Sequence, residues 1–390
     1  MRNSLENYLL QVVSGRQKGL LPRLTLFLLF ILEKIYIGII LVRSLLYRFN
    51  FFKQSSLKDC QVISIGNITV GGTGKTPIVK LLAEEYKKRG LKIVIVSRGY
   101  KSSDSQPRIV SNGSKRLLDI EEAGDEALML SKLLSDVPVV IGTDRYEAGK
   151  LAVREFNPDV ILLDDAFQHR QLERDKDIVL IDATNPFGYR HLLPRGLLRE
   201  PLKSLSRADL FIITKVNGIS QEKVKQICKT LRRYNSRADI FTAEYRSINI
   251  ILHSCLGMTK KDMTKKNIIK YNTELKSVEY LQDKHVIAFS GIGNPVSFEK
   301  SLLECGADLI KHMQFSDHHK YTESDIYDIC DLIKNKKIDL VVTTEKDAVK
   351  LDERLISMIT NNTDLAELVV AMDIENIDCF IDESLKKDIT

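Results

Sequence analysis

The sequence predicts an α/β protein with a parallel-sheet core, a second, smaller α/β domain and an N-terminal membrane-associated helix. Short runs of Val, Ile and Leu alternate with amphipathic stretches from residue 61 onward, as parallel strands buried on both faces and their crossover helices require. The same alternation resumes at residue 285, after a Lys-rich stretch. An almost wholly apolar run at 24–42 precedes both regions.

Length and composition set the domain organisation that we expect. A chain of 390 residues is too long for one compact core and long enough for two domains with an appendage. The cysteines are scattered without a C-x-x-C pair, which favours reduced thiols over a disulfide framework. We expect a basic, apolar, membrane-associated helical segment at 1–55, a core domain at 56–240, a linker with a Lys-rich insertion at 241–284, and the smaller domain at 285–390.

The N-terminal segment combines apolar character with positive charge. Residues 1–60 hold nine basic and three acidic residues, and nine minus three equals the whole formal net charge of +6. As a helix, 24–42 would span roughly 28 Å, close to the thickness of a bilayer core. Glu33 and Lys34 in its middle argue against a simple lipid-exposed span. Two interpretations stay open, a helix in or on a membrane surface and a buried core helix. The basic excess favours an anionic membrane surface as partner and argues against nucleic acid.

The apolar runs predict strands, and the amphipathic stretches predict helices. In the core domain we expect strands at 62–65, 92–96, 137–141, 160–163, 178–181 and 210–213, and helices at 77–89 and 125–134. The run at 240–252 predicts an extended linker or hairpin, and the Lys-rich stretch 258–276 predicts a solvated surface insertion. In the second domain we expect strands at 285–289, 309–315, 340–343 and 368–372, and helices at 296–305 and 323–334.

A phosphate-binding loop follows the first expected strand. The sequence Thr-Val-Gly-Gly-Thr-Gly-Lys-Thr lies between an apolar run and an amphipathic stretch, which is the context that a P-loop requires. Its glycines let backbone N–H groups face phosphate oxygens, its Lys reaches the β- and γ-phosphates, and its last Thr ligates Mg²⁺. The fold class is therefore a P-loop NTPase-like core, with ATP and Mg²⁺ as cofactors. The expected nucleotide contacts are Thr69, Val70, Gly71, Gly72, Thr73, Gly74, Lys75 and Thr76.

Two positions in this loop depart from known patterns. Thr69 stands where the general motif has its first Gly, so a Gly-rich turn without nucleotide is the alternative interpretation. Val70 stands where P-loop ATPases of the cell-division and partition type carry a second lysine, which argues against that group.

Acidic and basic residues follow two further expected strands. Asp164 and Asp165 end the run at 160–165, as a Walker B acid does when it serves Mg²⁺ or its waters. Adjacent residues of a strand point to opposite faces, so we expect the two carboxylates to act differently. Arg195 and Arg199 lie between two prolines after another strand that ends in Asp. They predict either phosphate contacts or a solvated loop.

Asp125 and His318 have less distinctive patterns. Asp125 opens an expected helix, and its position alone predicts a helix cap. His318 lies among loop residues between an expected strand and helix. The pattern alone does not pair these two side chains.

Taken together, the motifs resemble the tetraacyldisaccharide 4′-kinase family. The resemblance runs in the family's order through 65–77, Ser-Arg-Gly-Tyr at 97–100, Gly-Asp-Glu at 124–126, Asp-Asp-Ala-Phe-Gln-His at 164–169, the Pro-Arg segment 193–201, Phe-Ser-Asp-His at 315–318 and Thr-Glu-Lys-Asp at 344–347. It implies transfer of the ATP γ-phosphate to the 4′-hydroxyl of a tetraacyldisaccharide 1-phosphate in lipid A biosynthesis. It also implies an acylated disaccharide phosphate as substrate and the cytoplasmic face of the bacterial inner membrane as location. No obligate protein partner is expected.

The resemblance also implies roles for individual residues. Asp125 is the expected base on the acceptor hydroxyl, assisted by His318, and Lys75 is the expected contact to the triphosphate. The expected metal-site residues are Thr76, Asp164, Asp165, Gln168 and Glu200, and the expected substrate contacts are Arg98, Arg145, Arg195 and Arg199.

Two other functional classes stay open at this stage. One is a membrane-recruited P-loop ATPase that acts as a switch or partner-binding module. The other is a soluble small-molecule kinase in which 20–45 is a core helix.

Overall fold

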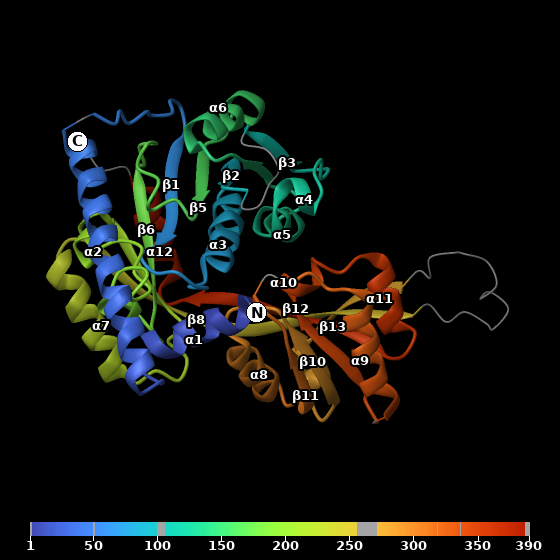
Figure 1. The fold of residues 1–390 in the computed structure, drawn as a ribbon. Coiled ribbons are helices and arrows are strands. Elements are labelled where there is room, and N and C mark those ends of the chain that lie inside the picture. Colours follow the sequence, from blue (N-terminus) through green and yellow to red (C-terminus); the bar gives the residue numbers. More distant parts are fainter. Residues whose placement is uncertain are drawn as a thin grey trace. The chain divides into compact units, whose positions relative to one another are not determined.

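The computed structural model describes residues 2–49, 51–99, 106–255, 271–317, 319–335 and 337–386. The chain forms two compact units (Figure 1), of which unit 1 contains Met1–Tyr245 and Met372–Thr390 and unit 2 contains Arg246–Ala371. Strands β8 (Asp239–Cys255) and β13 (Asp364–Ile374) each pass from one unit into the other along the chain. The predicted fold class is confirmed, with parallel strands, crossover helices and one apolar N-terminal helix.

Unit 1 is built on a parallel sheet with the strand order β3–β4–β2–β5–β1–β6–β7–β8. Each neighbouring pair is parallel except β3 with β4. In β1 and β5, Ile65 lies opposite Asp164, so the loops that follow these strands leave the same edge of the sheet. The strands are β1 Gln61–Asn67, β2 Ile93–Ser97, β3 Arg108–Asn112, β4 Pro138–Ile141, β5 Val160–Asp164, β6 Lys176–Asp182 and β7 Leu210–Thr214.

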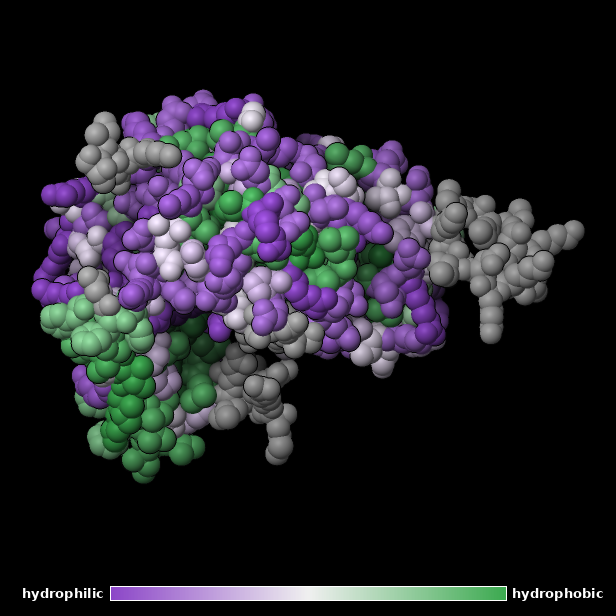
Figure 2. Space-filling view, turned by 90° about the horizontal axis from the view of Figure 1, so that it is seen from above, coloured by the Kyte–Doolittle hydropathy of each residue, from purple (hydrophilic) through white to green (hydrophobic). Residues whose placement is uncertain are grey.

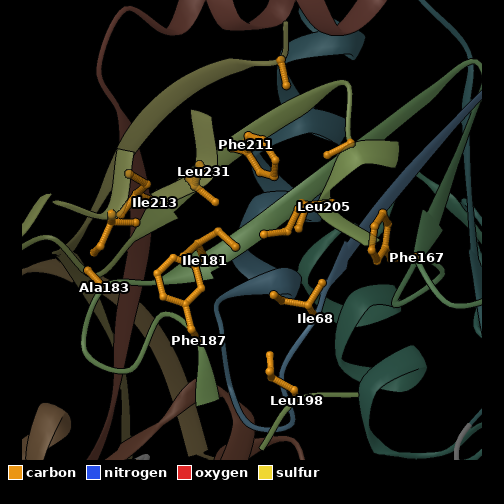
Figure 3. Packing of buried hydrophobic residues seen from close by; sticks show 14 of the residues in the cluster. Ile68, Phe167, Ile181, Ala183, Phe187, Leu198, Leu205, Phe211, Ile213 and Leu231 are labelled. Carbon is orange, nitrogen blue, oxygen red and sulfur yellow. The ribbon is translucent and has the colours of Figure 1, made fainter. Parts of the chain in front are cut away.

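Helices cover both faces of this sheet, because every residue of β1, β2, β5 and β7 is buried. One cluster, shown in Figure 3, joins β6 and β7 to helix α7 through residues such as Phe211 and Leu231. Ser220 caps α7 by accepting a hydrogen bond from Lys223 N–H. The helices of unit 1 are α1 Arg2–Val13, α2 Leu20–Arg48, α3 Lys75–Lys88, α4 Ile120–Ala123, α5 Asp125–Leu133, α6 Arg145–Phe156, η1 Gly188–Arg190, η2 Leu202–Arg207, α7 Gln221–Tyr234 and α12 Ile377–Leu385.

In unit 2, β11, β10, β12 and β13 are parallel neighbours in that order. Strand β8 pairs with β9 in an antiparallel hairpin. Helix α8 packs on one hydrophobic cluster, and α9 and α11 pack on another. The remaining elements are β9 Tyr271–Ser277, η4 Val278–Leu281, β10 His285–Ser290, α8 Pro295–Glu304, β11 Asp308–Gln314, α9 Glu323–Asn335, β12 Leu340–Thr344, α10 Glu345–Ala348 and α11 Glu353–Thr360.

The compact units differ from the expected segments in two places. The expected linker contributes strands β8 and β9, and the end of the expected Lys-rich insertion, Tyr271–Ser277, is strand β9 because it pairs with β8. Residues 256–270 lie outside the described part. The C-terminal helix α12 belongs to unit 1 because it packs on α3, where Tyr86 Oη lies 2.6 Å from Ser384 Oγ.

The exposed side of helix α2, on the surface of unit 1, is largely apolar. In the part of the chain that the structure describes, it is the one helix long and apolar enough to cross a membrane, and 11% of its most apolar stretch is buried. Figure 2 shows a concentrated hydrophobic surface at the lower left, in the position of this helix. Its exposed apolar residues include Leu24, Phe27, Leu28, Ile31, Ile35, Ile39 and Val42. This exposure does not fit the buried core helix that sequence patterning left open.

Candidate active site

The phosphate loop joins β1 to α3. Gly71 and Gly74 have φ angles of 113° and 94°, a region that side-chain-bearing residues rarely adopt. Gly74 also has no room for a side chain, because a Cβ there would lie 2.7 Å from both Tyr245 Oη and Met372 Cε. Helix α3 starts at the next residue, Lys75. The loop therefore ends at a helix N-terminus, where backbone N–H groups and the helix dipole favour an anion.

Two cations meet one carboxylate beside this loop. Lys75 Nζ lies 3.6 Å from Asp165 Oδ1, and Arg199 Nη1 donates to both oxygens of Asp165 at 2.9 and 3.0 Å. Burial raises the pKa of Asp165, but the charges of Lys75 and Arg199 outweigh burial and hold that pKa below its ordinary value. Asp165 thus stays ionised and keeps both cations at the carboxyl edge of the sheet.

Asp164, the neighbouring carboxylate, has a different environment. It is 1% exposed, and Ser97 Oγ lies 3.4 Å from its Oδ2. Among the described residues, no hydrogen-bond partner reaches its buried Oδ1. Burial, with the charges of Glu126 and Asp165, raises the pKa of Asp164 to about 7. The two adjacent carboxylates therefore differ in chemistry, as the sequence predicted.

A segment that we call the strap, residues 191–199, lies against the phosphate loop. Leu197 O accepts a hydrogen bond from Val70 N at 2.8 Å, and Arg199 N donates to Ile68 O at 2.7 Å. The strap thus carries Arg199 to Asp165 and forms a wall of the loop.

Gln168 reaches the same loop from the turn after β5. Its Nε2 donates to Asn67 O at 2.7 Å, and Asn67 Nδ2 donates to Thr73 Oγ1 at 2.9 Å. Gln168 Oε1 lies 3.5 Å from Arg199 Nη1. The predicted residues Lys75, Asp164, Asp165, Gln168 and Arg199 therefore come together.

Arg98 and Arg145 follow β2 and β4 at the same sheet edge. Arg98 is exposed, whereas Arg145 is 3% exposed and its Nη1 donates to Gly142 O at 2.8 Å. Burial lowers the pKa of Arg145 to about 10, while Asp164 opposes and Arg98 reinforces this shift. The buried guanidinium adds positive charge beside Asp164.

Arg195 and Glu200 have other partners than the groups around Lys75. Arg195 Nη1 lies 3.7 Å from Glu33 Oε2, and its guanidinium lies over the ring of Phe30 of α2, 5.1 Å from the ring centroid. Glu200 is buried, and its Oε2 lies 2.8 Å from Arg207 Nη1. An ion pair on a neighbouring element cannot be read from sequence spacing, so the pattern alone did not separate Arg195 from Arg199.

Asp125 is the first residue of α5, and Gly124, with φ 80°, is the N-cap. The prediction that Asp125 is the cap is therefore wrong, because the positive φ of the cap position suits Gly. The next residue, Glu126, is one of the charges that raise the pKa of Asp164. The first turn of α5 and the end of β5 thus share one electrostatic environment. His318 lies outside the described residues.

Comparison with known proteins identifies the family of this chain. The family model described as Tetraacyldisaccharide-1-P 4'-kinase matches residues 25–386. The chain belongs to this family. A tetraacyldisaccharide 4'-kinase of Halothermothrix orenii is 44% identical over 352 residues, which cover 90% of this chain and 89% of the relative. The relative of the same name in Geobacter metallireducens is 37% identical over 333 residues, covering 85% and 90%.

A solved structure has the same fold. The "apo" form of LpxK from Aquifex aeolicus in complex with ATP has a TM-score of 0.68 and 30% identity, covering 91% of this chain and 96% of that one. Membership of the tetraacyldisaccharide-1-P 4'-kinase family makes this chain a kinase of lipid A biosynthesis and does not favour the switch-type ATPase.

The donor set at the end of β5 fits a magnesium ion of this kinase family. Mg²⁺ prefers oxygen ligands, keeps several waters and takes one or two carboxylates. Asp164 supplies a buried carboxylate oxygen without a described partner, and Thr76 supplies a hydroxyl in the first turn of α3. In the described ranges, no group of three or more His, Cys, Asp or Glu side chains could hold a metal by itself.

Sequence reasoning missed Lys215, which follows β7 at the same sheet edge. Its Nζ lies 2.5 Å from Gly72 O and 2.5 Å from Asp182 Oδ2, and the preceding Thr214 donates its hydroxyl to Thr73 O at 2.8 Å. These contacts hold the phosphate loop from the β6–β7 side. A signal was present, because Lys215 directly follows an apolar strand, as Asp164 ends one.

Proposed function

We propose that this chain transfers the γ-phosphate of ATP to the 4′-hydroxyl of a tetraacyldisaccharide 1-phosphate at the site around Lys75. The observation that carries the proposal is the convergence of Lys75 and Arg199 on Asp165, next to the buried Asp164, at the end of the phosphate loop. Phosphoryl transfer depends on positioning and on stabilising charge that spreads over the transferred group. Two relatives that are tetraacyldisaccharide 4'-kinases and the ATP complex of the Aquifex aeolicus protein support the same reaction.

The reaction needs one proton acceptor and one set of cations. The acceptor oxygen forms a bond to the γ-phosphorus, the bond from that phosphorus to the bridging oxygen breaks, and ADP leaves. We assign Asp125 as the base that takes the hydroxyl proton, with His318 assisting, and Lys75 and Arg199 as the cations that stabilise the phosphoryl oxygens. A bound Mg²⁺, held by Thr76 and Asp164, would neutralise charge on the triphosphate.

The acceptor is an amphiphile, so we place the enzyme at a lipid surface, on the cytoplasmic face of the bacterial inner membrane. The exposed apolar residues of α2 support this location, because a patch of this kind marks a lipid or protein contact. The basic excess of residues 1–60 favours an anionic surface.

Phosphate transfer from labelled ATP to the tetraacyldisaccharide 1-phosphate in detergent micelles tests the reaction. We expect labelled lipid from the full chain, and a loss of kcat of about 100- to 1000-fold in Asp125→Asn with little change in MgATP affinity. Glu121→Gln, on the exposed first turn of α4, is the matched control. ATP hydrolysis without labelled lipid would favour a switch ATPase, and equal turnover in Asp125→Asn would remove the base assignment.

A vesicle assay tests the location separately. Phe27, Ile31 and Ile35 are 64%, 43% and 58% exposed on α2. Replacing all three by Ser removes exposed apolar surface without touching the buried face of the helix. We expect weaker binding to phosphatidylglycerol vesicles and nearly normal turnover of micellar acceptor. Unchanged vesicle binding would contradict the role of α2 at the membrane.

A further inference from the structure

Helix α2 buries one carboxylate within a predominantly apolar sequence. Glu33 is 5% exposed. Its Oε1 accepts a hydrogen bond from Leu192 N at 2.9 Å and lies 3.2 Å from His191 Nδ1. Its Oε2 lies 3.7 Å from Arg195 Nη1. All of these contacts are made with the strap, and none of them requires that Glu33 face lipid.

The strap transmits these contacts to the phosphate loop. Its first residues bind Glu33, and its last residues make the backbone hydrogen bonds to Ile68 and Val70. The strap is compact between these points, because a Cβ on Gly196 would lie 2.2 Å from His191 O. We therefore expect a displacement of the strap at its Glu33 end to change the position of Arg199 relative to Asp165.

Two further side chains of α2 bind the same neighbourhood. Tyr36 Oη donates to Arg199 O at 2.9 Å, and Arg43 Nη2 lies 2.5 Å from Gln168 O. Glu33, Tyr36 and Arg43 are spaced by three and seven residues, which places them on one face of the helix. The apolar residues Ile31, Ile35 and Ile39 are exposed instead. Helix α2 thus has a polar row toward the phosphate site and an apolar surface toward solvent.

Packing alone does not require a carboxylate at residue 33. Burying a charge is unfavourable unless hydrogen bonds and ion pairs compensate, and an apolar side chain could fill the same space. A carboxylate differs from an apolar side chain in that it accepts directed hydrogen bonds. At Glu33 the acceptor is aimed at Leu192 N–H, which fixes where the strap starts.

We infer that Glu33 is a positioning residue for phosphate transfer, through which α2 holds the strap, and with it Arg199, against the phosphate loop. The helix that faces the membrane is then also part of the framework of the nucleotide site. The expected loss of phosphate transfer rests on the proposed function, whereas the expected loss of MgATP affinity does not.

The test compares Glu33→Leu, Glu33→Gln and the control Lys34→Gln in the full chain. Lys34 is the exposed neighbour of Glu33, so its variant removes a charge from the same turn without touching the strap. For each variant we would measure MgATP affinity by titration, kcat with micellar acceptor, thermal unfolding and binding to phosphatidylglycerol vesicles. We expect Glu33→Leu to lower kcat at least tenfold and to weaken MgATP binding severalfold, with vesicle binding unchanged. Glu33→Gln should recover part of both losses, because an amide oxygen still accepts from Leu192 N–H.

The outcomes separate the inference from the proposed function. Glu33→Leu with parental kcat and MgATP affinity would overturn the inference even if the parent phosphorylates lipid. A parent chain that yields no labelled lipid, while Glu33→Leu still weakens MgATP binding, would overturn the proposed reaction and support the inference. If Glu33→Leu does not fold, Tyr36→Phe takes its place. Loss of the hydroxyl contact to Arg199 O should then lower kcat severalfold, and unchanged kcat would count against the inference.

Discussion

Each unit has a buried aspartate near the carboxyl ends of parallel strands, and the two aspartates differ in their hydrogen bonds. In unit 1, β1 and β5 end at the phosphate loop and Asp164, and buried Asp164 Oδ1 has no partner among the described residues. In unit 2, β10 and β12 end beside Asp347, which is fully buried. Its carboxylate accepts hydrogen bonds from Gly291 N at 3.0 Å, Thr344 Oγ1 at 2.7 Å and Lys350 Nζ at 2.8 Å.

This difference in hydrogen bonding indicates that Asp347 has a structural role and that Asp164 is available to a ligand. Asp347 is satisfied within unit 2, so its burial is compensated and its role is to fix the loop after β10. Asp164 has a raised pKa and a free oxygen, which is costly unless a ligand supplies the missing partner. Hydrogen-bond satisfaction, rather than position at a sheet edge, distinguishes the two. Variants of both regions test that distinction, in order of their expected effect on turnover.

Lys75→Ala should have the largest effect. The ammonium group lies at the start of α3 beside Asp165, and its loss removes a charge that stabilises the transferred phosphoryl group. We expect kcat to fall about 1000-fold or more, with a stable fold. Single-turnover phosphorylation and a thermal melt measure the two quantities. A variant with more than a tenth of parental turnover would remove the assignment of Lys75 to the triphosphate.

Asp164→Asn should lower kcat about 100-fold and change the pH dependence of stability. The pKa of Asp164 is raised from 3.8 to about 7, so its ionised form destabilises the fold. That cost is absent below about pH 4, grows as pH rises to 7 and is complete above 7. At roughly 1.4 kcal/mol per pKa unit, its ceiling is about 4 kcal/mol.

Unfolding without Mg²⁺ at pH 5 and pH 8 measures this effect. Asp164→Asn should be more stable than the parent at pH 8, and the gain should shrink at pH 5. Added Mg²⁺ should stabilise the parent but not the variant. An equal difference between parent and variant at both pH values would contradict the raised pKa.

Lys215→Met should reduce turnover less, by about tenfold. Lys215 binds the loop backbone at Gly72, and we assign it no contact with a phosphate group. The Michaelis constant for ATP should rise with it. Asp182→Asn should give a similar result, since Asp182 holds the same ammonium group. Lys225→Met, on the exposed side of α7, is the control. Normal ATP kinetics in Lys215→Met would show that the loop holds its shape without this contact.

Asp347→Asn should affect stability and leave chemistry nearly unchanged. Lys350, which is 3% exposed, would keep its charge without its carboxylate partner, at a cost of about 3 kcal/mol in the free energy of unfolding. Denaturant unfolding should detect this loss, whereas kcat should stay within about twofold. Lys346→Gln, which removes the pair with Asp317, is the milder control. Lost activity with unchanged stability would place Asp347 among the functional residues and contradict the distinction drawn between Asp347 and Asp164.

Much of the phosphate site was predictable because its residues are local or end recognisable strands. The loop around Lys75 is continuous in sequence, and parallel pairing of β1 and β5 brings Asp164 and Asp165 to its edge. Arg199 was identified in a distinctive segment, but its contact with Asp165 depends on backbone pairing between the strap and the loop. The assignments of Asp125 and His318 stay predictions.

Hydrophobic periodicity in the sequence did not predict the features that depend on tertiary packing. Helix α12 lies on α3, although the sequence placed its residues with the second domain. Strand β9 continues from a Lys-rich stretch and owes its extended form to pairing with β8. Lys215 is separated from Gly72 by more than one hundred residues, and the pairing of β7 with β6 and of β6 with β1 brings them together.

By itself, the sequence determined the fold class, the phosphate loop and an apolar helix at the N-terminus, because hydrophobic period and glycine spacing are local properties of the chain. The tertiary structure decided which charges are satisfied. Glu33 is mid-helix in the sequence and a strap contact in the fold, and only the neighbours of Asp164 and Asp347 show that one lacks a described partner for an oxygen and the other has three hydrogen-bond donors. Partners distant in sequence set the burial and hydrogen bonding of a charge, and these in turn determine its pKa and its availability to a ligand.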